Sequence, residues 1–171
     1  MMGLDDGGLL DSEAPPVEVR GLISRFGDRI IHDNLDLVVN RGEIVGVVGG
    51  SGTGKSVLLN TIIGLRPAEG GSVKIFGQDI RFAHRAHWSA INRLWGVLFQ
   101  QGALWSNLTV RENVAAPLFE HTDMLKDEID ELADLKIALA GLPPGAGALK
   151  PSELSGGMIK RVALARALIM E

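Results

Sequence analysis

The sequence predicts an α/β fold in which a phosphate-binding loop joins a buried parallel strand to a helix. The loop is the run GGSGTGKS at residues 49–56, which fits the pattern G-x-x-x-x-G-K-[ST]. The apolar, β-branched run 43–48 (EIVGVV) before it is typical of a buried parallel strand. The run 55–64 (KSVLLNTIIG) behind it has apolar residues at helical spacing. Strand, glycine turn and helix together are the context that this pattern requires.

The residue types of the loop suit a bound nucleoside triphosphate and a magnesium ion. Gly49, Gly52 and Gly54 leave room for backbone N–H groups to curl around phosphate oxygens. Lys55 can reach the β- and γ-phosphates at the positive end of the helix dipole, and Ser56 can place its hydroxyl on Mg²⁺. The remaining members of the predicted site are Gly50, Ser51, Thr53 and Val57. The alternative is a glycine-rich turn that binds no ligand.

Composition excludes several other classes of site. The 171 residues suit a single domain, and 17 basic against 21 acidic side chains give a net charge of −4, which argues against nucleic acid as a partner. The chain has no cysteine, so His32, His84 and His87 are interpreted as structural. Residues 1–16 are acidic and read as a flexible leader without the basic start of a signal peptide. No apolar run approaches the ~18 residues of a membrane span, so we expect a cytoplasmic chain.

Alternating apolar and polar residues predict two half-buried strands near the start, 17–26 and 35–39. The turn Gly27-Asp28-Arg29 lies between them, so the two strands are expected to form an antiparallel layer. After the first helix, Arg66-Pro67 and the glycine turn that follows break the helical pattern, and residues 72–76 return as a strand.

The later part of the chain is mainly helical in pattern. A short helix is predicted over 84–93, and the run 95–99 (WGVLF) is predicted as a second buried strand that ends at Gln100. A further helix is expected to begin at the capping box Thr109/Glu112 and to bend or end near Pro117. The next predicted helix covers 123–140, is capped by Thr122 and has one apolar face, formed by Leu125, Ile129, Leu132, Leu135 and Leu139. A Pro/Gly linker over 141–150 and a last helix over 158–170 complete the chain.

Three further segments resemble motifs of one family. Leu154-Ser155-Gly156-Gly157-Met158 resembles the LSGGQ signature of ATP-binding cassette (ABC) ATPases, and Ser155 lies one hundred residues after Lys55, a separation usual for that family. The segment 99–110 (FQQGALWSNLTV) resembles its Q-loop, with Gln100 at the glutamine position. Phe26 stands where the family places an aromatic residue that stacks on adenine. The fold implied is a P-loop NTPase of the ABC type, with a mixed sheet core, an antiparallel β layer and a helical subdomain.

The resemblance also implies a partner subunit. In the family two ATPase subunits pack head to tail, so Ser155, Gly156 and Gly157, at a helix start with exposed N–H groups, would close on the ATP of the partner. Gln100 would sense the attacking water and the Mg²⁺ that Ser56 binds. From the residues alone the alternatives stay open: a helix N-cap for the signature, a core position for the aromatic residue and a polar strand end for the glutamine.

Within the family, the segments GGSGTGKSVLL, FQQGALW, PLFEHT and PSELSGGM look most like the ATPase of Mla-type phospholipid transporters. That resemblance implies a cytoplasmic ATPase, peripheral on the inner face of the cell membrane, which couples Mg-ATP binding and hydrolysis to phospholipid transport. A membrane permease would contact the region from Gly102 to His121. The alternatives are a soluble ABC ATPase without a permease, a non-catalytic nucleotide-binding fragment and a small-molecule kinase, of which the signature disfavours the kinase.

The sequence departs from the family pattern in three places. Met158 replaces the usual glutamine of the signature, and Val57 replaces a second hydroxyl after Ser56. The sequence stops after ALARALIME, where the family continues into a strand that carries a magnesium-binding Asp and a catalytic Glu. Glu153 and Glu171 follow no apolar strand, so neither is predicted as the base.

We therefore expect a C-terminally truncated ABC domain whose catalytic residues are unknown apart from the sensing role of Gln100. Its parts are a nucleotide-binding core with the antiparallel layer over 17–103, a helical subdomain over 104–153, and the signature motif with its helix over 154–171. The strand before the loop would lack a neighbour, so apolar surface is expected to stay uncovered around Ile44, Val45 and Val47.

Overall fold

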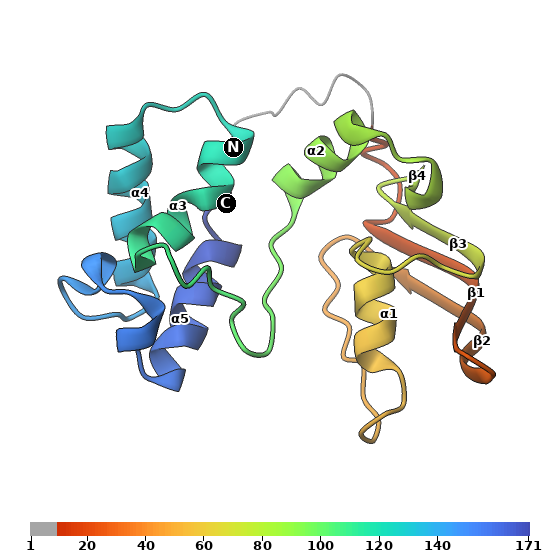
Figure 1. The fold of residues 1–171 in the computed structure, drawn as a ribbon. Coiled ribbons are helices and arrows are strands. Elements are labelled where there is room, and N and C mark those ends of the chain that lie inside the picture. The colour runs from red at the N-terminus through yellow and green to blue at the C-terminus, as the bar shows by residue number, and fades with distance from the viewer. Residues whose placement is uncertain (1–9) are drawn as a thin grey trace. The chain divides into compact units, whose positions relative to one another are not determined.

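The computed structural model describes residues 10–171, which fall into two compact units (Figure 1). The first unit reaches Ile91 and the second runs from Asn92 to Glu171. The elements are β1 (Val17–Phe26), β2 (Arg29–Val39), α1 (Lys55–Ile62), β3 (Gly70–Ile75), β4 (Gln78–Asp79), η1 (Ile80–Phe82), α2 (Arg85–Leu94), α3 (Val110–His121), α4 (Lys126–Leu139), η2 (Ala146–Ala148), η3 (Pro151–Glu153) and α5 (Gly156–Ala167).

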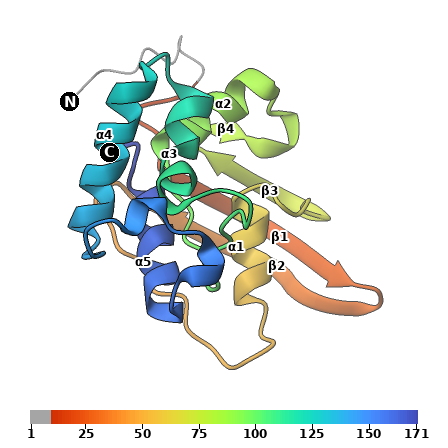
Figure 2. The same ribbon diagram turned by 60° about the vertical axis from the view of Figure 1, so that its left-hand side comes forward.

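The first unit is built on an antiparallel sheet of strand order β2-β1-β3-β4. β1 and β2 form a long hairpin, in which Val17 pairs with Val39 and Phe26 with Arg29 (Figure 2). β1 also pairs with β3, and α1 packs against both of these strands. The antiparallel layer predicted from alternation is confirmed, with β2 beginning six residues earlier than the predicted strand at Leu35.

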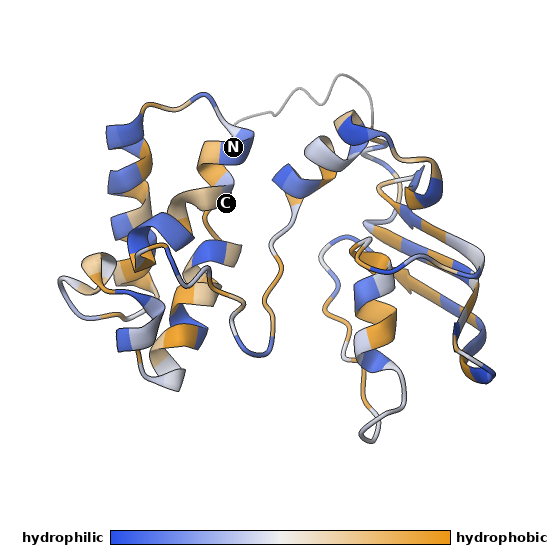
Figure 3. Ribbon diagram, in the orientation of Figure 1, coloured by the Kyte–Doolittle hydropathy of each residue, from blue (hydrophilic) through white to orange (hydrophobic). Residues whose placement is uncertain are grey.

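Two predicted strands are wrong. Neither 43–48 nor 95–99 belongs to a strand of the described chain. Ile44 and Val48 are 98% and 91% exposed, although Figure 3 colours this stretch as hydrophobic. A parallel strand needs a neighbour to bond its backbone groups, and the sheet contains no strand beside either run. The expected uncovered apolar surface is present, since Val45 and Val47 are also exposed.

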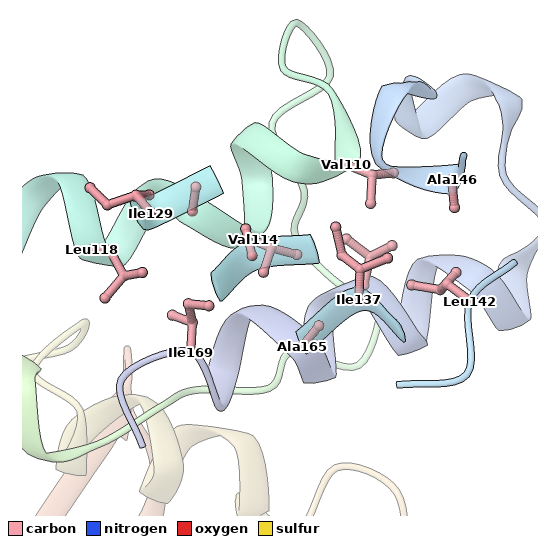
Figure 4. Packing of buried hydrophobic residues seen from close by; sticks show 12 residues of the cluster. Val110, Val114, Leu118, Ile129, Ile137, Leu142, Ala146, Ala165 and Ile169 are labelled. Carbon is pink, nitrogen blue, oxygen red and sulfur yellow. The ribbon is translucent and has the colours of Figure 1, made fainter. Parts of the chain in front are cut away.

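The second unit is a helical cluster in which α3, α4 and α5 pack together. Its core is a set of buried aliphatic side chains that meet between the three helices (Figure 4). The labelled members are Val110, Val114, Leu118, Ile129, Ile137, Leu142, Ala146, Ala165 and Ile169. α5 therefore shares one core with α3 and α4.

The capping box of α3 is confirmed, with Thr109 accepting from the backbone N–H of Glu112 and Glu112 accepting from that of Thr109. α3 continues through Pro117 to His121. α4 begins later than predicted, because Thr122 ends α3 by donating its hydroxyl to the carbonyl oxygen of Leu118 at 2.7 Å.

The predicted apolar face of α4 is only partly correct. Ile129 is buried, but Leu125, Leu135 and Leu139 are exposed, and Ala133 and Ile137 are buried in their place. α5 likewise begins at Gly156, two residues before the predicted start, while α2 lies close to its predicted bounds.

Residues 1–9 of the predicted leader lie outside the described residues. The remainder of that leader is attached to the sheet, because Leu10 is buried and the backbone N–H of Asp11 donates to the carbonyl oxygen of Phe76 at 2.9 Å. Across residues 10–171, the helices are too short or too polar to span a membrane.

Candidate nucleotide-binding site

The glycine loop at 49–56 curls around its own lysine. Gly52 and Gly54 have φ angles of 77° and 99°, values that residues with side chains rarely adopt. The ammonium group of Lys55 donates to the carbonyl oxygens of Gly49 and Gly50, each at 2.6 Å. α1 begins at Lys55, so the free N–H groups of its first turn are next to the loop that the ammonium binds. The arrangement concentrates positive charge at the loop, as an anion site requires.

The loop is fixed to the sheet at Gly54. A Cβ at this position would lie 2.5 Å from Cγ2 of Ile31 and 2.8 Å from Nε2 of His32, so only glycine fits between the loop and β2. His32 is itself buried, and burial lowers the pKa of its imidazole, against a smaller opposite effect of hydrogen bonding with the Gly54 backbone. The imidazole is therefore neutral near pH 7 and adds no charge to the site, in keeping with its interpretation as structural.

Ser56 is the predicted magnesium ligand in the first unit. It is exposed, it follows Lys55 in the first turn of α1, and its hydroxyl is a hard oxygen ligand of the kind that Mg²⁺ prefers. Between Leu10 and Glu171 there is no group of three or more His, Asp or Glu side chains arranged to hold a metal ion. Val57 follows on α1 and is half-buried.

Phe26, the predicted adenine contact, lies at the end of β1 with 53% of its surface exposed. It is therefore not a core residue, which removes the alternative left open by the sequence. The guanidinium of Arg66 lies over its ring at 4.0 Å from the centroid. Arg66 was not singled out as a site residue, because the two lie forty residues apart and no sequence pattern links them.

Gln100 lies in an exposed turn of the second unit. The backbone of the segment that follows it is bound by Arg166. The Arg166 guanidinium donates to the carbonyl oxygens of Gly102 and Ala103 at 2.7 and 2.8 Å. Both of those residues have positive φ, 80° and 47°. Arg166 is only 8% exposed, and burial lowers its pKa. The segment after Gln100 is thus fixed to α5, the helix that starts at the signature.

Replacing Arg166 with Met is expected to lower the free energy of unfolding by about 2–4 kcal/mol, because a buried carbonyl oxygen on Gly102 and a partly buried one on Ala103 lose a charged donor. Urea unfolding followed by circular dichroism measures this. Arg161→Met is the matched control on α5, since Arg161 is exposed and makes a single bond to the carbonyl oxygen of Gly141. The control is expected to cost less than about 1 kcal/mol. Equal losses in both variants would contradict the role assigned to Arg166.

The signature segment occupies the N-terminus of α5. The Ser155 hydroxyl caps the helix by accepting from the backbone N–H of Met158 at 3.3 Å. Gly156 and Gly157 form the first turn, and a Cβ on either would meet no atom within 4 Å. Both glycines and Ser155 are exposed. Internal packing therefore gives no reason for glycine here, and the space above this helix end is open.

The structure places the predicted residues in two groups. The glycine loop, Ser56 and Phe26 belong to the first unit, whereas Gln100 and the signature belong to the second. Sequence reasoning missed Arg66, Arg166 and the buried Asn113, whose amide donates to three carbonyl oxygens between Trp105 and Thr109. A signal existed for Arg166 alone, as a charged residue inside the apolar run ALARAL.

A lysine folded into a loop of left-handed glycines at a helix start is the architecture of P-loop nucleotide-binding proteins. The order of the motifs narrows the class, because a second glycine-containing helix start follows one hundred residues later. A family model described as "ABC transporter" matches residues 32–171, and the chain belongs to the ABC transporter family.

Known proteins resemble the chain over most of its length. It is 44% identical to the intermembrane phospholipid transport system ATP-binding protein MlaF of Haemophilus influenzae, over 91% of this chain and 58% of that protein. It is 39% identical to MlaF of Escherichia coli K12, over 94% and 59%, and 44% identical to the probable ribonucleotide transport ATP-binding protein mkl of Mycobacterium bovis, over 91% and 43%. The chain thus spans about half the length of these relatives.

Solved structures confirm the fold class. The dimeric post-hydrolysis state of the ATP-binding cassette MJ0796 bound to ADP and Pi superposes with a TM-score of 0.81 at 33% identity, covering 90% of this chain and 69% of that one. A second dimeric structure of MJ0796, described as a bacterial ABC transporter cassette, gives a TM-score of 0.78 at 31% identity over the same shares.

Proposed function

We propose that the chain is the nucleotide-binding part of an ABC transporter ATP-binding subunit, which couples ATP binding and hydrolysis to phospholipid transport through a membrane permease. The observation that carries the nucleotide site is the ammonium of Lys55, held 2.6 Å from two loop carbonyl oxygens at the start of α1. An incoming phosphate offers this ammonium a negatively charged acceptor in place of neutral ones. The lipid substrate is supported by the likeness to the two MlaF proteins.

In this site Lys55 and the N–H groups of the loop bind the β- and γ-phosphates, and Phe26 supports the base. Ser56 would hold a magnesium ion. The ion would neutralise phosphate charge as it develops. The remaining loop residues, Gly49 to Gly54, shape the cradle through their backbone.

A second ATPase subunit and a permease are the proposed partners. Support for a head-to-tail dimer comes from the open helix end at Ser155, Gly156 and Gly157, and from the dimeric cassettes that the chain resembles. The region from Gly102 to His121 is proposed to face the permease. Two aromatic side chains in it, Trp105 and Phe119, are half-exposed and suit a protein contact. The subunit would then lie on the cytoplasmic face of the membrane.

Lys55→Ala is expected to weaken ATP binding about 10- to 100-fold, because it removes a charged hydrogen bond to phosphate. Stability is expected to change little, since the lysine bonds only exposed loop carbonyls. Isothermal titration calorimetry with Mg-ATP measures the effect. Lys74→Ala is the control. Lys74 lies on β3 between the buried Val73 and Ile75, so its side chain points to the face of the sheet opposite to theirs. Equal ATP affinity in both variants and the parent would contradict the proposed site.

A further inference from the structure

We propose that Arg66 is a positioning residue for the nucleotide base, whose guanidinium supports one face of the Phe26 ring so that adenine stacks on the other face. This inference rests on the proposed function, because it takes Phe26 as the platform for the base. It assigns a role to a residue outside the glycine loop, the Q-loop and the signature.

The contact between Arg66 and Phe26 is close. The guanidinium carbon lies 4.0 Å from the ring centroid, whereas the other three arginine–aromatic pairs among residues 10–171 lie at 5.3 to 5.6 Å. A guanidinium carbon at this distance lies over the ring and well within the range of a cation–π interaction. Phe26 nevertheless keeps 53% of its surface exposed, which leaves room for a second contact.

A set of hydrogen bonds holds the guanidinium in this position. Arg66 donates to the carbonyl oxygen of Arg25 and to the carboxylate of Glu69, the latter at 3.4 Å. Glu69 in turn accepts from the backbone N–H of Arg25 at 3.0 Å, and its own N–H donates to the carbonyl oxygen of Ile23 at 3.1 Å. Both backbone groups of Arg25 are thus bound, which fixes the residue directly before Phe26.

Arg66 also connects the aromatic platform to the phosphate loop. Its backbone N–H donates to the carbonyl oxygen of Asn60 near the end of α1, at 3.1 Å. The same helix begins at Lys55, in the loop. One residue therefore contacts both the platform for the base and the helix that carries the phosphate-binding lysine, and the spacing between the two parts of the site depends on it.

The chemistry of the stack favours a purine on the open face. A cation over one face of an aromatic ring is attracted by the negative charge of that face. It draws electron density from the ring, so a purine meets a less negative surface on the other side, and offset stacking of two aromatic systems becomes more favourable. A long-range attraction between Arg66 and phosphate would act equally on a ligand without a base, and the two effects can therefore be separated.

The test compares ATP with inorganic tripolyphosphate, each with Mg²⁺, by calorimetric titration of the 171-residue chain. Arg66→Gln is expected to weaken ATP binding about 3- to 10-fold, while tripolyphosphate binding changes less than about 2-fold. Arg81→Gln is the matched control, because Arg81 also pairs with a carboxylate, that of Asp79, and lies 5.4 Å from the ring of Phe82. This control is expected to leave both affinities unchanged.

A second measurement places Arg66→Gln in a Phe26→Ala background. If Arg66 acts through the ring, the substitution changes ATP affinity by less than about 2-fold once the ring is absent. Because both ligands titrate the same folded population, the ratio of their affinities stays informative even if Arg66→Gln lowers the unfolding midpoint.

Three results would overturn the inference. One is equal weakening of ATP and tripolyphosphate by Arg66→Gln, which would assign Arg66 to general charge or folding. Another is an unchanged or tighter affinity for ATP, and the third is full additivity with Phe26→Ala. Failure of the unmodified chain to bind tripolyphosphate and ATP would instead overturn the proposed nucleotide site, and the role of Arg66 with it.

Discussion

ATP hydrolysis by the 171-residue chain is expected to stay near the uncatalysed background, even at saturating Mg-ATP. The glycine loop, Lys55 and Ser56 can bind the nucleotide, but hydrolysis also needs a carboxylate that orients and activates water. No apolar run ending in Asp-Glu follows the signature within the sequence. A positioned general base contributes typically about 10²–10⁴-fold to a rate.

The acidic residues near the motifs are engaged elsewhere. Glu153, directly before the signature, accepts from the backbone N–H of Lys150 at 2.6 Å and caps η3. Glu43, in the run before the loop, accepts from the backbone and side-chain nitrogens of Asn40 at 2.7 and 3.0 Å. Both carboxylates are thus tied to nearby backbone of their own turns through Oε2.

A longer version of the protein, extended through the strand with Asp and Glu that the family carries, is expected to regain hydrolysis by about two to four orders of magnitude. Single-turnover release of phosphate from the two proteins, side by side, measures the difference. Lys55→Ala in the longer version serves as the inactive control. Equal rates in the short and long proteins would mean that a base lies within these 171 residues and that the site is wrongly assigned.

The features that the sequence predicted well depend on near neighbours in the chain. The capping box of Thr109 and Glu112 lies within one turn, and the glycine loop is set by dihedral angles that glycine alone adopts easily. β1 was predicted with its observed bounds, 17–26, because apolar and polar residues alternate along most of it, although a register shift between Val19 and Leu22 interrupts the alternation.

The features that it missed depend on distant partners. The run 43–48 has the composition of a buried strand, but composition does not supply the neighbouring strand that would pair with it. On α4, Leu135 is more hydrophobic than Ala133, yet packing against α3 and α5 buries the alanine. The bonds of Arg166 to Gly102 and Ala103 span more than sixty residues and leave no periodic trace.

Of the candidate site, sequence patterns therefore located the loop, Gln100 and the signature, each of which is a short local motif. They could not locate Arg66, because its contact with Phe26 forms only when the end of β1 and the segment after α1 come together. Supporting residues of this kind are defined by tertiary contacts, and a single sequence gives no measure of those.

In the longer protein, Gly156→Asp is expected to abolish ATP turnover while the subunit folds more stably and still binds ATP. Gly156 is the first residue of α5, and a Cβ there would meet no atom within 4 Å. Replacing a helical glycine removes its excess backbone freedom in the unfolded chain, and a carboxylate at a helix N-terminus interacts favourably with the dipole. Each effect contributes about 0.3–1 kcal/mol to stability.

When a head-to-tail dimer closes, the same carboxylate would repel the γ-phosphate of the ATP bound to the partner subunit. Stability is therefore expected to rise while turnover falls. A residue that served only as part of a helix cap could not produce this result, because a better cap would not harm activity. Steady-state phosphate release, the urea midpoint and calorimetric ATP binding, measured on one preparation, give the three quantities. Lys126→Asp is the matched control, since it places an aspartate at the first residue of α4, on an exposed helix start in the same unit. The turnover of Lys126→Asp is expected to equal that of the parent protein. If Gly156→Asp also showed normal turnover, the signature would be only a helix start, without a role in the partner's site.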